Sequence, residues 1–358
     1  MKKTPLYNEH LELKAKMVNF GGFNMPIQYQ GISIEHNCVR NNVGIFDVSH
    51  MGEFFVSGKD SSAFLNYICT NDIYKIEING AQYNCFTNNN GGIVDDLIIY
   101  RCNEHEYMLV VNASNIEKDW NWIKTNLGGY QCEITNESEN IGLISVQGPK
   151  SIYLINDVFN QDFSSLKKFN FQEIFFYNSK IIISNTGYTG SKGFEIYINK
   201  EVISLIWNDL LIKGEKYGLQ PIGLGARDTL RMEMGYCLYG NDIDDNTTPY
   251  EANLMWATNL NKDFIGKDRV INSMNKSLNK MIHFKMIERG IPRNGYEICD
   301  ASGKIIGNVT SGTFSPTHKT GIGIGYINKK FSVGESIYLK IRDKLITAEI
   351  VKLPLKNG

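Results

Sequence analysis

Short runs of β-branched and aromatic residues alternate with clusters of Gly, Asn and Asp over most of the chain. This pattern is typical of strands separated by tight turns, and it predicts strands at residues 52–57, 81–87, 92–100, 106–112, 141–147, 180–186 and 194–199. Apolar positions that recur at helical spacing predict helices at residues 8–17, 61–69, 116–127, 200–217 and 222–234. Because strands and helices do not alternate regularly, the pattern predicts an α+β fold rather than a doubly wound sheet.

After about residue 280 the helical patterning stops, and short alternating segments with Gly turns take over. These segments predict strands at residues 281–287, 304–311, 323–326, 336–340 and 344–352. The tail is therefore expected to form a small separate β-barrel or sandwich. No repeat of fixed period and no low-complexity linker is present, so we expect closely packed domains.

The composition is that of an ordinary globular protein. With 358 residues, 42% hydrophobic and 21% charged, the chain has room for two or three domains and is not disordered, collagenous or a coiled coil. The formal net charge of -1 gives no bulk attraction to nucleic acid or to an anionic membrane surface. Neither is therefore expected as a partner.

The cysteines point to a reducing compartment. All seven are scattered without a CxxC pair, which argues against a disulfide framework and against a zinc site, and we expect no metal. No apolar run follows the lysines at positions 2 and 3, and no apolar stretch approaches the roughly 20 residues that span a bilayer. The cytoplasm is the simplest location.

The segment 88–100 is the most unusual in the chain. A polar turn leads into a strand that is apolar on both faces yet carries two adjacent carboxylates, Asp95 and Asp96. Because side chains alternate, Asp96 shares a face with Ile98 and Tyr100 while Asp95 points the other way. A carboxylate in apolar surroundings is a candidate for acid/base or cation-stabilising work. The alternative is that one Asp caps the turn and the other pairs with a lysine.

A second stretch, residues 185–197, places Glu195 and Tyr197 on one strand face. Its glycines suggest close approach by a ligand or by another backbone: Gly187, Gly190 and Gly193. If Glu195 faces a cleft, its carboxylate can accept two parallel N–H bonds from an amino-pyrimidine edge. Alternation alone makes it a solvated strand residue.

Two arginines, Arg227 and Arg231, are spaced i, i+4 near the start of a predicted helix and so lie on one face. Their ordinary role would be ion pairing with Asp228 or Glu233. Their alternative role is to grip the carboxylate of a ligand.

Other candidate residues are individually weak. Tyrosines are most often core or interface residues, and a lone histidine is more often a structural hydrogen-bonding group than a base; the positions concerned are Tyr83, Tyr100, Tyr188, Tyr236 and His50. No HExxH, GxSxG or GxxxxGK[ST] motif is present, and no GxGxxG joins a strand to a helix. Zincin, serine hydrolase, P-loop and Rossmann functions therefore lack support.

Taken together, six motifs resemble the aminomethyltransferase (T-protein) family of the glycine cleavage system. In order along the chain they are residues 47–52 (DVSHMG), 91–97 (GGIVDDL), 187–190 (GYTG) with Glu195, 225–231 (GARDTLR), 239–244 (YGNDID) and 309–312 (VTSG). The resemblance runs from residue 4 to the C-terminus. It implies a three-lobed cloverleaf of two mixed α/β lobes and a small C-terminal β-barrel around a central folate site. The lobes expected are residues 1–50 with 138–242, residues 51–137 with 243–278, and residues 279–358.

The resemblance also implies a reaction. A lipoyl arm on a partner, the H-protein, presents an aminomethyl group, tetrahydrofolate takes the methylene as co-substrate, and ammonia leaves. A carboxylate beside the iminium-like carbon can stabilise developing positive charge, and the family pattern selects Asp96 for this catalytic role. By the same resemblance Glu195 holds the amino edge of the pterin, Asn112 adds hydrogen bonds and Arg227 contacts the folate. The pterin and aminobenzoyl slot would be lined by Met51, Tyr83, Tyr100, Tyr188 and Tyr236.

The C-terminus departs from the family pattern. Family members commonly end in a Pro-Phe motif followed by a basic residue that contacts the folate tail, whereas this chain has Pro354, Leu355 and Lys356. Lys356 stands where Arg often does, and it lacks the bidentate fork of a guanidinium.

Three rival functions remain at this stage. A folate-dependent demethylase, or the folate domain of a dimethylglycine or sarcosine oxidase, would keep the fold, although the chain has no room for the flavin domain of the oxidases. A non-catalytic folate-binding relative in iron–sulfur maintenance would carry a Lys-Gly-Cys-Tyr type motif, which the sequence around Cys237 lacks. A plain interaction module would leave the Asp95–Asp96 strand unexplained.

Overall fold

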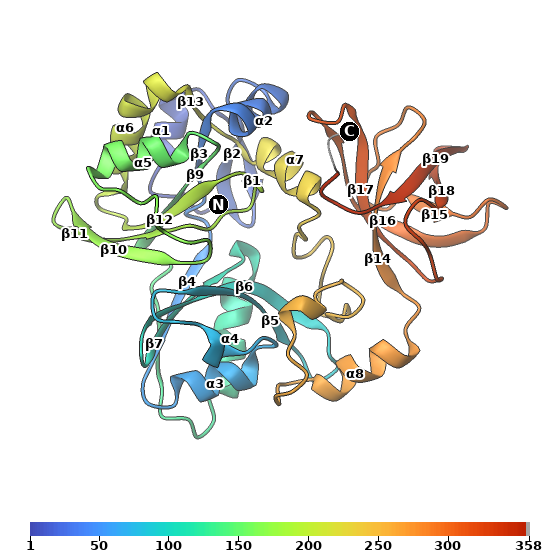
Figure 1. Cartoon of the computed structure of the whole chain (residues 1–358), viewed down its shortest axis with the longest axis horizontal. Coiled ribbons are helices and arrows are strands. Elements are labelled where there is room, and N and C mark those ends of the chain that lie inside the picture. Colours follow the sequence, from blue (N-terminus) through green and yellow to red (C-terminus); the bar gives the residue numbers. More distant parts are fainter. Residues whose placement is uncertain (356–358) are drawn as a thin grey trace. The chain divides into compact units, whose positions relative to one another are not determined.

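The computed structural model of the protein describes residues 1–355 and divides into two compact units (Figure 1). Unit 1 comprises residues 1–68, 72–84 and 96–227, and unit 2 comprises residues 69–71, 85–95 and those from 228 onward. Mixed sheets with helices in one part of the chain and a closed barrel in another give an α+β fold, as the sequence pattern predicts.

A six-stranded sheet forms one part of unit 1. Its strand order is β10-β11-β12-β9-β3-β13, and only the β13–β3 pair is parallel among the pairings described. The strands are β3 (Val43–Asp47), β9 (Ile141–Gln147), β10 (Phe171–Phe176), β11 (Ser179–Ser184), β12 (Gly193–Asn199) and β13 (Leu219–Pro221).

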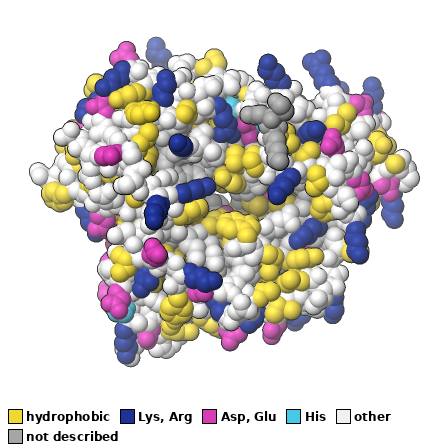
Figure 2. All heavy atoms as spheres, viewed as in Figure 1, with side chains coloured by type: hydrophobic (Ala, Val, Ile, Leu, Met, Phe, Trp, Pro, Cys, Tyr) yellow, Lys and Arg dark blue, Asp and Glu magenta, His cyan; other side chains and the backbone are white. Residues whose placement is uncertain are grey.

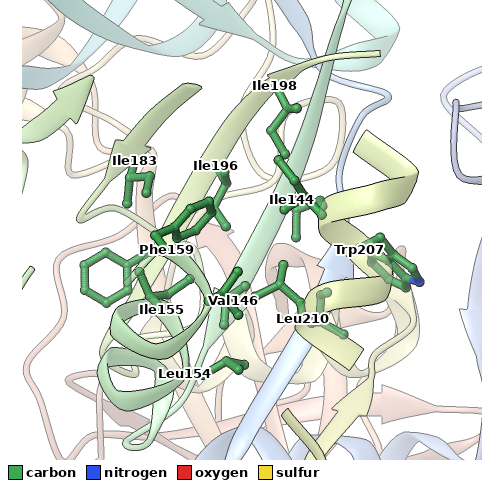
Figure 3. Close-up of a cluster of buried hydrophobic side chains, with 14 of the residues drawn as sticks. Ile144, Val146, Leu154, Ile155, Phe159, Ile183, Ile196, Ile198, Trp207 and Leu210 are labelled. Atoms are coloured by element: carbon green, nitrogen blue, oxygen red, sulfur yellow. The ribbon is translucent and has the colours of Figure 1, made fainter. Parts of the chain in front are cut away.

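Two helices, α5 (Ser151–Phe159) and α6 (Ile203–Gly214), cover one face of this sheet (Figure 3). The alternation along β12 directs Phe194, Ile196 and Ile198 into the cluster that these helices complete, where Trp207 is fully buried. Burying side chains of this size is worth about 1.5–3 kcal/mol each, which holds the sheet and the helices together. Glu195 and Tyr197 consequently lie on the opposite face.

The other main sheet has the order β5-β6-β7-β4-β8. Its strands are β4 (Gly52–Ser57), β5 (Ala81–Thr87), β6 (Ile93–Asn103), β7 (Glu106–Val111) and β8 (Glu133–Asn136), and the helices nearby in the chain are α3 (Ser61–Ile68) and α4 (Ile116–Asn126). The ring of Phe54 in β4 packs on Trp120 of α4 at 5.3 Å between centroids. Strand β6 is an interior strand between β5 and β7, and most of its apolar residues are buried, on both faces, as the sequence pattern indicates.

The N-terminal segment corrects one predicted helix. We expected a helix over residues 8–17, but α1 (Tyr7–Glu12) is shorter, and β1 (Lys16–Phe20) pairs with β2 (Phe23–Gln28) before α2 (Ile32–Asn41). The helix ends because Lys14 adopts φ +56°, outside the right-handed helical region. The Gly pair at positions 21 and 22, both with positive φ, then closes the hairpin.

Unit 2 contains the C-terminal barrel. Six strands close in the order β14-β17-β16-β15-β18-β19, with bounds β14 (Lys280–Met286), β15 (Glu297–Cys299), β16 (Ile305–Ser315), β17 (Thr320–Ile327), β18 (Ser336–Ile341) and β19 (Lys344–Val351). Inward-facing residues such as Phe284, Ile298 and Leu339 fill its interior. The barrel expected from the sequence is confirmed. The remaining α-helices are α7 (Leu224–Met234) and α8 (Lys267–Lys276), and the 3₁₀ turns are η1 (Ile73–Lys75), η2 (Ala113–Asn115), η3 (Glu215–Tyr217) and η4 (Met255–Ala257).

Within residues 1–355 no helix is long and apolar enough to cross a membrane. The same described residues contain no group of three or more His, Cys, Asp or Glu side chains that could hold a metal ion. On the face shown in Figure 2 the Lys and Arg side chains are dispersed among uncharged atoms and do not gather in one patch.

Candidate active site

Asp96 lies in β6 with two side chains oriented toward its carboxylate. The Tyr83 hydroxyl donates to Oδ2 at 2.9 Å, and the Asn112 amide donates to Oδ1 at 2.9 Å and to the Asp96 main-chain oxygen at 3.0 Å. Tyr83 comes from β5 and Asn112 from the end of β7, the two strands next to β6 in the sheet. Asp96 is half-buried, so its carboxylate is held in a fixed orientation while part of it remains accessible.

The adjacent carboxylate differs in both direction and burial. Asp95 is fully buried and lies on the other face of β6. The turn before the strand is capped by Asn88, whose Oδ1 accepts the main-chain N–H groups of Asn90 and Gly92 at 2.9 and 3.1 Å. The turn-capping role considered for one of the two aspartates is therefore filled by an asparagine.

Glu195 lies in β12 on the sheet face opposite the helices. Thr186 Oγ1 donates to its Oε2 at 2.6 Å, and the same threonine oxygen lies 3.1 Å from the Tyr100 hydroxyl. Burial raises the pKa of Glu195 above its ordinary value of 4.5, while the Thr186 hydrogen bond and the positive charge of Arg227 act in the opposite direction. Tyr100 belongs to β6, on the same face as Asp96 and four residues further on, about 13 Å along an extended strand.

Arg227 and Tyr188 complete the surroundings of Glu195. The guanidinium of Arg227 lies over the Tyr188 ring at 4.4 Å from its centroid, a cation–π contact. Both residues line a small hollow with Glu195, together with Phe46, Val48, Ser145 and Thr189. The hollow, of about 10 Å³, thus brings a carboxylate, a guanidinium and an aromatic ring to one place.

The loop 185–193 is held by a residue that sequence reasoning missed. Gln147 donates from Nε2 to the Thr186 carbonyl at 3.1 Å and accepts from the Thr189 hydroxyl at 2.9 Å. A Cβ added at Gly187 or Gly193 would lie 2.3 or 2.4 Å from atoms of this amide. The sequence suggested close approach by a ligand or another backbone at these glycines, but the group that approaches Gly187 and Gly193 is the Gln147 side chain. The signal in the sequence that could have identified Gln147 is a polar residue at the end of the apolar strand 141–147.

Thr186 and Tyr197 were also missed as contributors to the surroundings of Glu195. The Tyr197 hydroxyl forms a hydrogen bond of 2.9 Å with the Tyr100 hydroxyl, and Tyr197 is 4% exposed. Its position two residues after Glu195 on the same strand face was visible in the sequence. Thr186 lies just beyond β11, and only the pairing of β11 with β12 brings it to the carboxylate.

In unit 2 Arg231 is buried and makes ion pairs and hydrogen bonds within the protein. It is 2% exposed and donates to Asp228 at 2.8 Å, to Asp242 at 2.7 Å and to Ser311 at 3.0 Å. The ion pair with Asp228 that the sequence suggested is present. Arg231 also donates to the main-chain oxygen of Tyr236 at 2.9 Å, so it positions that predicted site residue.

The other predicted residues are placed as follows. Met51 follows the 47–50 segment in unit 1 and is half-buried, and Tyr236 is half-buried in unit 2. Lys356 lies outside the described residues. His50 is buried, and its pKa is lowered to about 3, first by burial and then by the charge of Arg227, so it stays neutral and is a weak base.

A larger cleft in unit 1, of about 420 Å³, does not coincide with these clusters. Its walls come from residues such as Phe55, Met108, Lys180 and Asn199, and none of the predicted site residues is among them. Tyr197 borders this cleft and so connects it with the hydroxyl groups around Glu195. We place the candidate site at the Asp96 and Glu195 clusters because each holds a carboxylate that is oriented by side-chain hydrogen bonds.

Comparison with known proteins decides the family. The model of the GCVT N-terminal domain matches residues 6–262, and that of the glycine cleavage T-protein C-terminal barrel domain matches residues 279–356. The chain belongs to the glycine cleavage T-protein family. An aminomethyltransferase of Flavobacterium psychrophilum is 48% identical over 357 residues, with 99% of each chain covered, and one of Bacteroides thetaiotaomicron is 46% identical over 363 residues, with 100% of each covered.

A solved T-protein has the same fold. The crystal structure of glycine cleavage system aminomethyltransferase T from Bartonella henselae superposes with a TM-score of 0.93 at 32% sequence identity, covering 99% of this chain and 97% of that one. The resemblance inferred from the six motifs is confirmed. As a T-protein the chain is an enzyme, an aminomethyltransferase of the glycine cleavage system.

Proposed function

We propose that this T-protein transfers the methylene of the aminomethyl group on the lipoyl arm of H-protein to tetrahydrofolate, giving 5,10-methylenetetrahydrofolate and releasing ammonia. Two C–N bonds to folate nitrogens form while the C–S and C–N bonds of the aminomethyl thioether break. The two folate N–H protons leave with the sulfur and with ammonia, so the reaction balances without an oxidant. The observation that supports this most directly is the Asp96 carboxylate held by Tyr83 and Asn112.

Asp96 is proposed as the catalytic residue. Its carboxylate is preorganised by two donors, and a fixed negative charge beside the methylene stabilises the positive charge that develops as the C–N bond breaks. Asn112 orients this carboxylate and adds hydrogen bonds to the pterin. Tyr83 acts from the other side of the same carboxylate and also lines the slot.

Glu195 is proposed to bind the amino edge of the pterin. A carboxylate accepts two parallel N–H bonds in this geometry, and the Arg227 guanidinium over Tyr188 supplies a flat wall with positive charge for the anionic folate. By the family resemblance, Met51 and Tyr100 are also proposed to line the pterin slot. Tyr236 and Lys356 are proposed as folate contacts by the same resemblance. We also propose, from the family resemblance, that the three lobes are residues 1–50 with 138–242, residues 51–137 with 243–278, and residues 279–358.

Partner and location follow from the family. H-protein is the proposed macromolecular partner, and the cytoplasm is the proposed compartment. The seven cysteines are scattered along the sequence without a CxxC pair, which supports a reducing environment.

The proposed reaction is tested by ammonia release from aminomethylated lipoyl H-protein, measured with and without tetrahydrofolate. We expect release at a rate that tetrahydrofolate raises by at least about 10²-fold, because the folate nitrogen is the nucleophile that accepts the methylene. Folate binding without ammonia release would contradict the proposal and would move the function to a demethylase or a non-catalytic folate protein.

Replacing Glu195 with Gln is expected to weaken tetrahydrofolate binding by about 10-fold or more, since an amide keeps the shape but loses the charge-assisted hydrogen bonds. Because the pKa of Glu195 is raised above 4.5, wild-type affinity should fall with decreasing pH as the carboxylate takes up a proton above the ordinary glutamate range. Isothermal titration at several pH values measures both effects.

The Gln variant should lose this pH dependence along with the affinity. Glu201→Gln, at an exposed position just after the same strand, is the matched control and should bind like wild type. Equal affinity of Glu195→Gln and wild type would remove Glu195 from pterin binding.

A further inference from the structure

Three buried hydroxyl side chains of unit 1 form a continuous hydrogen-bonded chain that ends on the Glu195 carboxylate. Tyr197 lies 2.9 Å from the Tyr100 hydroxyl, Tyr100 lies 3.1 Å from Thr186 Oγ1, and Thr186 donates to Glu195 Oε2 at 2.6 Å. Tyr100 is fully buried and Tyr197 is 4% exposed. These residues come from β6, from the segment just beyond β11 and from β12, so the chain exists only in the folded protein.

The direction of the hydrogen bonds follows from the chemistry of the end group. An ionised carboxylate only accepts, so the Thr186 hydrogen is used toward Glu195. Thr186 must then accept from Tyr100, and Tyr100, having spent its single hydrogen, must accept from Tyr197. Every hydroxyl in the chain therefore donates toward Glu195, and successive donors polarise one another.

Both phenols remain donors at physiological pH. Burial raises the pKa of Tyr100, and the carboxylate of Glu195 raises it further. Burial also raises the pKa of Tyr197 well above its ordinary value, with Tyr100, Glu195 and Glu53 acting in the same direction. The polar and charged groups acting on Glu195 are Thr186 and Arg227. Ser184 Oγ lies 3.0 Å from the Thr186 oxygen as a second neighbour.

Packing alone does not require these hydroxyls. The Tyr197 and Tyr100 rings meet edge to face at 5.4 Å, and Tyr100 meets Phe171 in the same way at 5.6 Å, contacts that phenylalanines would also make. A buried hydroxyl is unfavourable unless it is hydrogen-bonded. A row of phenols that ends on a carboxylate therefore indicates a role for the hydroxyls themselves.

We propose that Tyr197, acting through Tyr100 and Thr186, is a positioning residue that holds the Glu195 carboxylate ionised and oriented for its ligand. This inference rests on the proposed role of Glu195 in binding the amino edge of the pterin. It adds a residue that does not itself touch the ligand, and it predicts a graded response. Removing a hydroxyl should weaken ligand binding less as its distance from Glu195 increases, in the order Thr186, Tyr100, Tyr197.

The test compares Thr186→Val and Tyr197→Phe with wild type. Tyr107→Phe is the matched control, because it removes an equally buried phenol hydroxyl, bonded at 2.7 Å to Ser62, from β7 of the same unit. We expect the dissociation constant for tetrahydrofolate to rise about 10-fold in Thr186→Val and about 3-fold in Tyr197→Phe, and to stay unchanged in Tyr107→Phe. The turnover number at saturating folate should stay within about two-fold in all three variants.

A second readout separates positioning from general loosening. The pH at which folate affinity falls should move upward in Thr186→Val, and upward by less in Tyr197→Phe, because fewer donors stabilise the charged carboxylate. The pKa of Glu195 itself can be followed without folate by ¹³C-carboxyl NMR, with the resonance assigned by its loss in Glu195→Gln. This pKa should rise in the same order.

The outcomes distinguish the two proposals. If wild type binds no folate but the Glu195 pKa shifts as expected, the hydroxyl chain stands and the proposed function falls. If wild type binds folate and Tyr197→Phe matches Tyr107→Phe in affinity, pH profile and Glu195 pKa, the positioning role is wrong.

Discussion

Asp96→Asn is expected to lower the rate of ammonia release from aminomethylated H-protein by at least about 10²-fold while leaving folate affinity within about two-fold of wild type. The amide has no negative charge to stabilise the positive charge that develops at the methylene. It also mismatches its neighbours, because Tyr83 and Asn112 both donate toward the carboxylate, and one of them would face an NH₂ group. Single-turnover ammonia release and folate titration separate the two effects.

Asp95→Asn is the natural comparison, since it changes the adjacent carboxylate on the opposite face of β6. Asp95 is fully buried, so its variant is first checked for an unchanged unfolding transition. We expect its turnover to stay within about 10-fold of wild type. Near-normal turnover of Asp96→Asn would remove Asp96 from the proposed role, whichever way the Asp95 variant behaves.

Arg231→Met is expected to destabilise unit 2 by about 3–5 kcal/mol, the usual effect of breaking a buried ion pair. The change strands the Asp242 carboxylate, whose side chain is fully buried and which loses the Arg231 partner at 2.7 Å. It also removes the contacts of Arg231 to Ser311 in the barrel and to the Tyr236 carbonyl. Urea unfolding measures the loss of stability, and hydrogen exchange of the barrel amides shows whether the loss lies in unit 2.

Lys340→Met provides the matched control in the same unit. Its ion pair with Glu297, at 3.0 Å, is well exposed, so its removal should leave the unfolding transition close to that of wild type. The double variant Arg231→Met with Asp242→Asn should recover part of the loss, because the stranded charge is gone. Equal stabilities of Arg231→Met and Lys340→Met would contradict the structural role of Arg231.

Secondary structure was predictable where the pattern is long and periodic. The ranges expected for β4, β5 and β9 match the observed strands, and the predicted barrel strands lie within about four residues of the observed ones. The expected elements did not include the helices α2, α5 and α8 or the short strands β13 and β15. The two strands have only three residues each, which carry too little periodicity, and they are held by their longer partners. The helix expected over 8–17 was too long because a positive φ at Lys14 depends on the hairpin that follows.

The candidate site was only partly predictable for the same reason. Alternation correctly separated Asp95 from Asp96 and placed Glu195 with Tyr197, since both inferences are local. Gln147 and Thr186 were missed because their role depends on strand pairing. Their side chains reach the 185–193 loop and the Glu195 carboxylate only when β9, β11 and β12 lie side by side.

The sequence by itself determined the α+β class, the separate barrel and the strand faces of Asp95, Asp96 and Glu195, because these depend on local periodicity. It also determined the family, because the family motifs occur in order along the chain. Only the tertiary structure decided which polar groups meet. It brings Tyr83 and Asn112 to Asp96, buries Arg231 on Asp242, and aligns Tyr197, Tyr100 and Thr186 on Glu195. The physical reason is that hydrogen bonds act over about 3 Å between residues far apart in sequence, and only the packed sheets bring such residues that close.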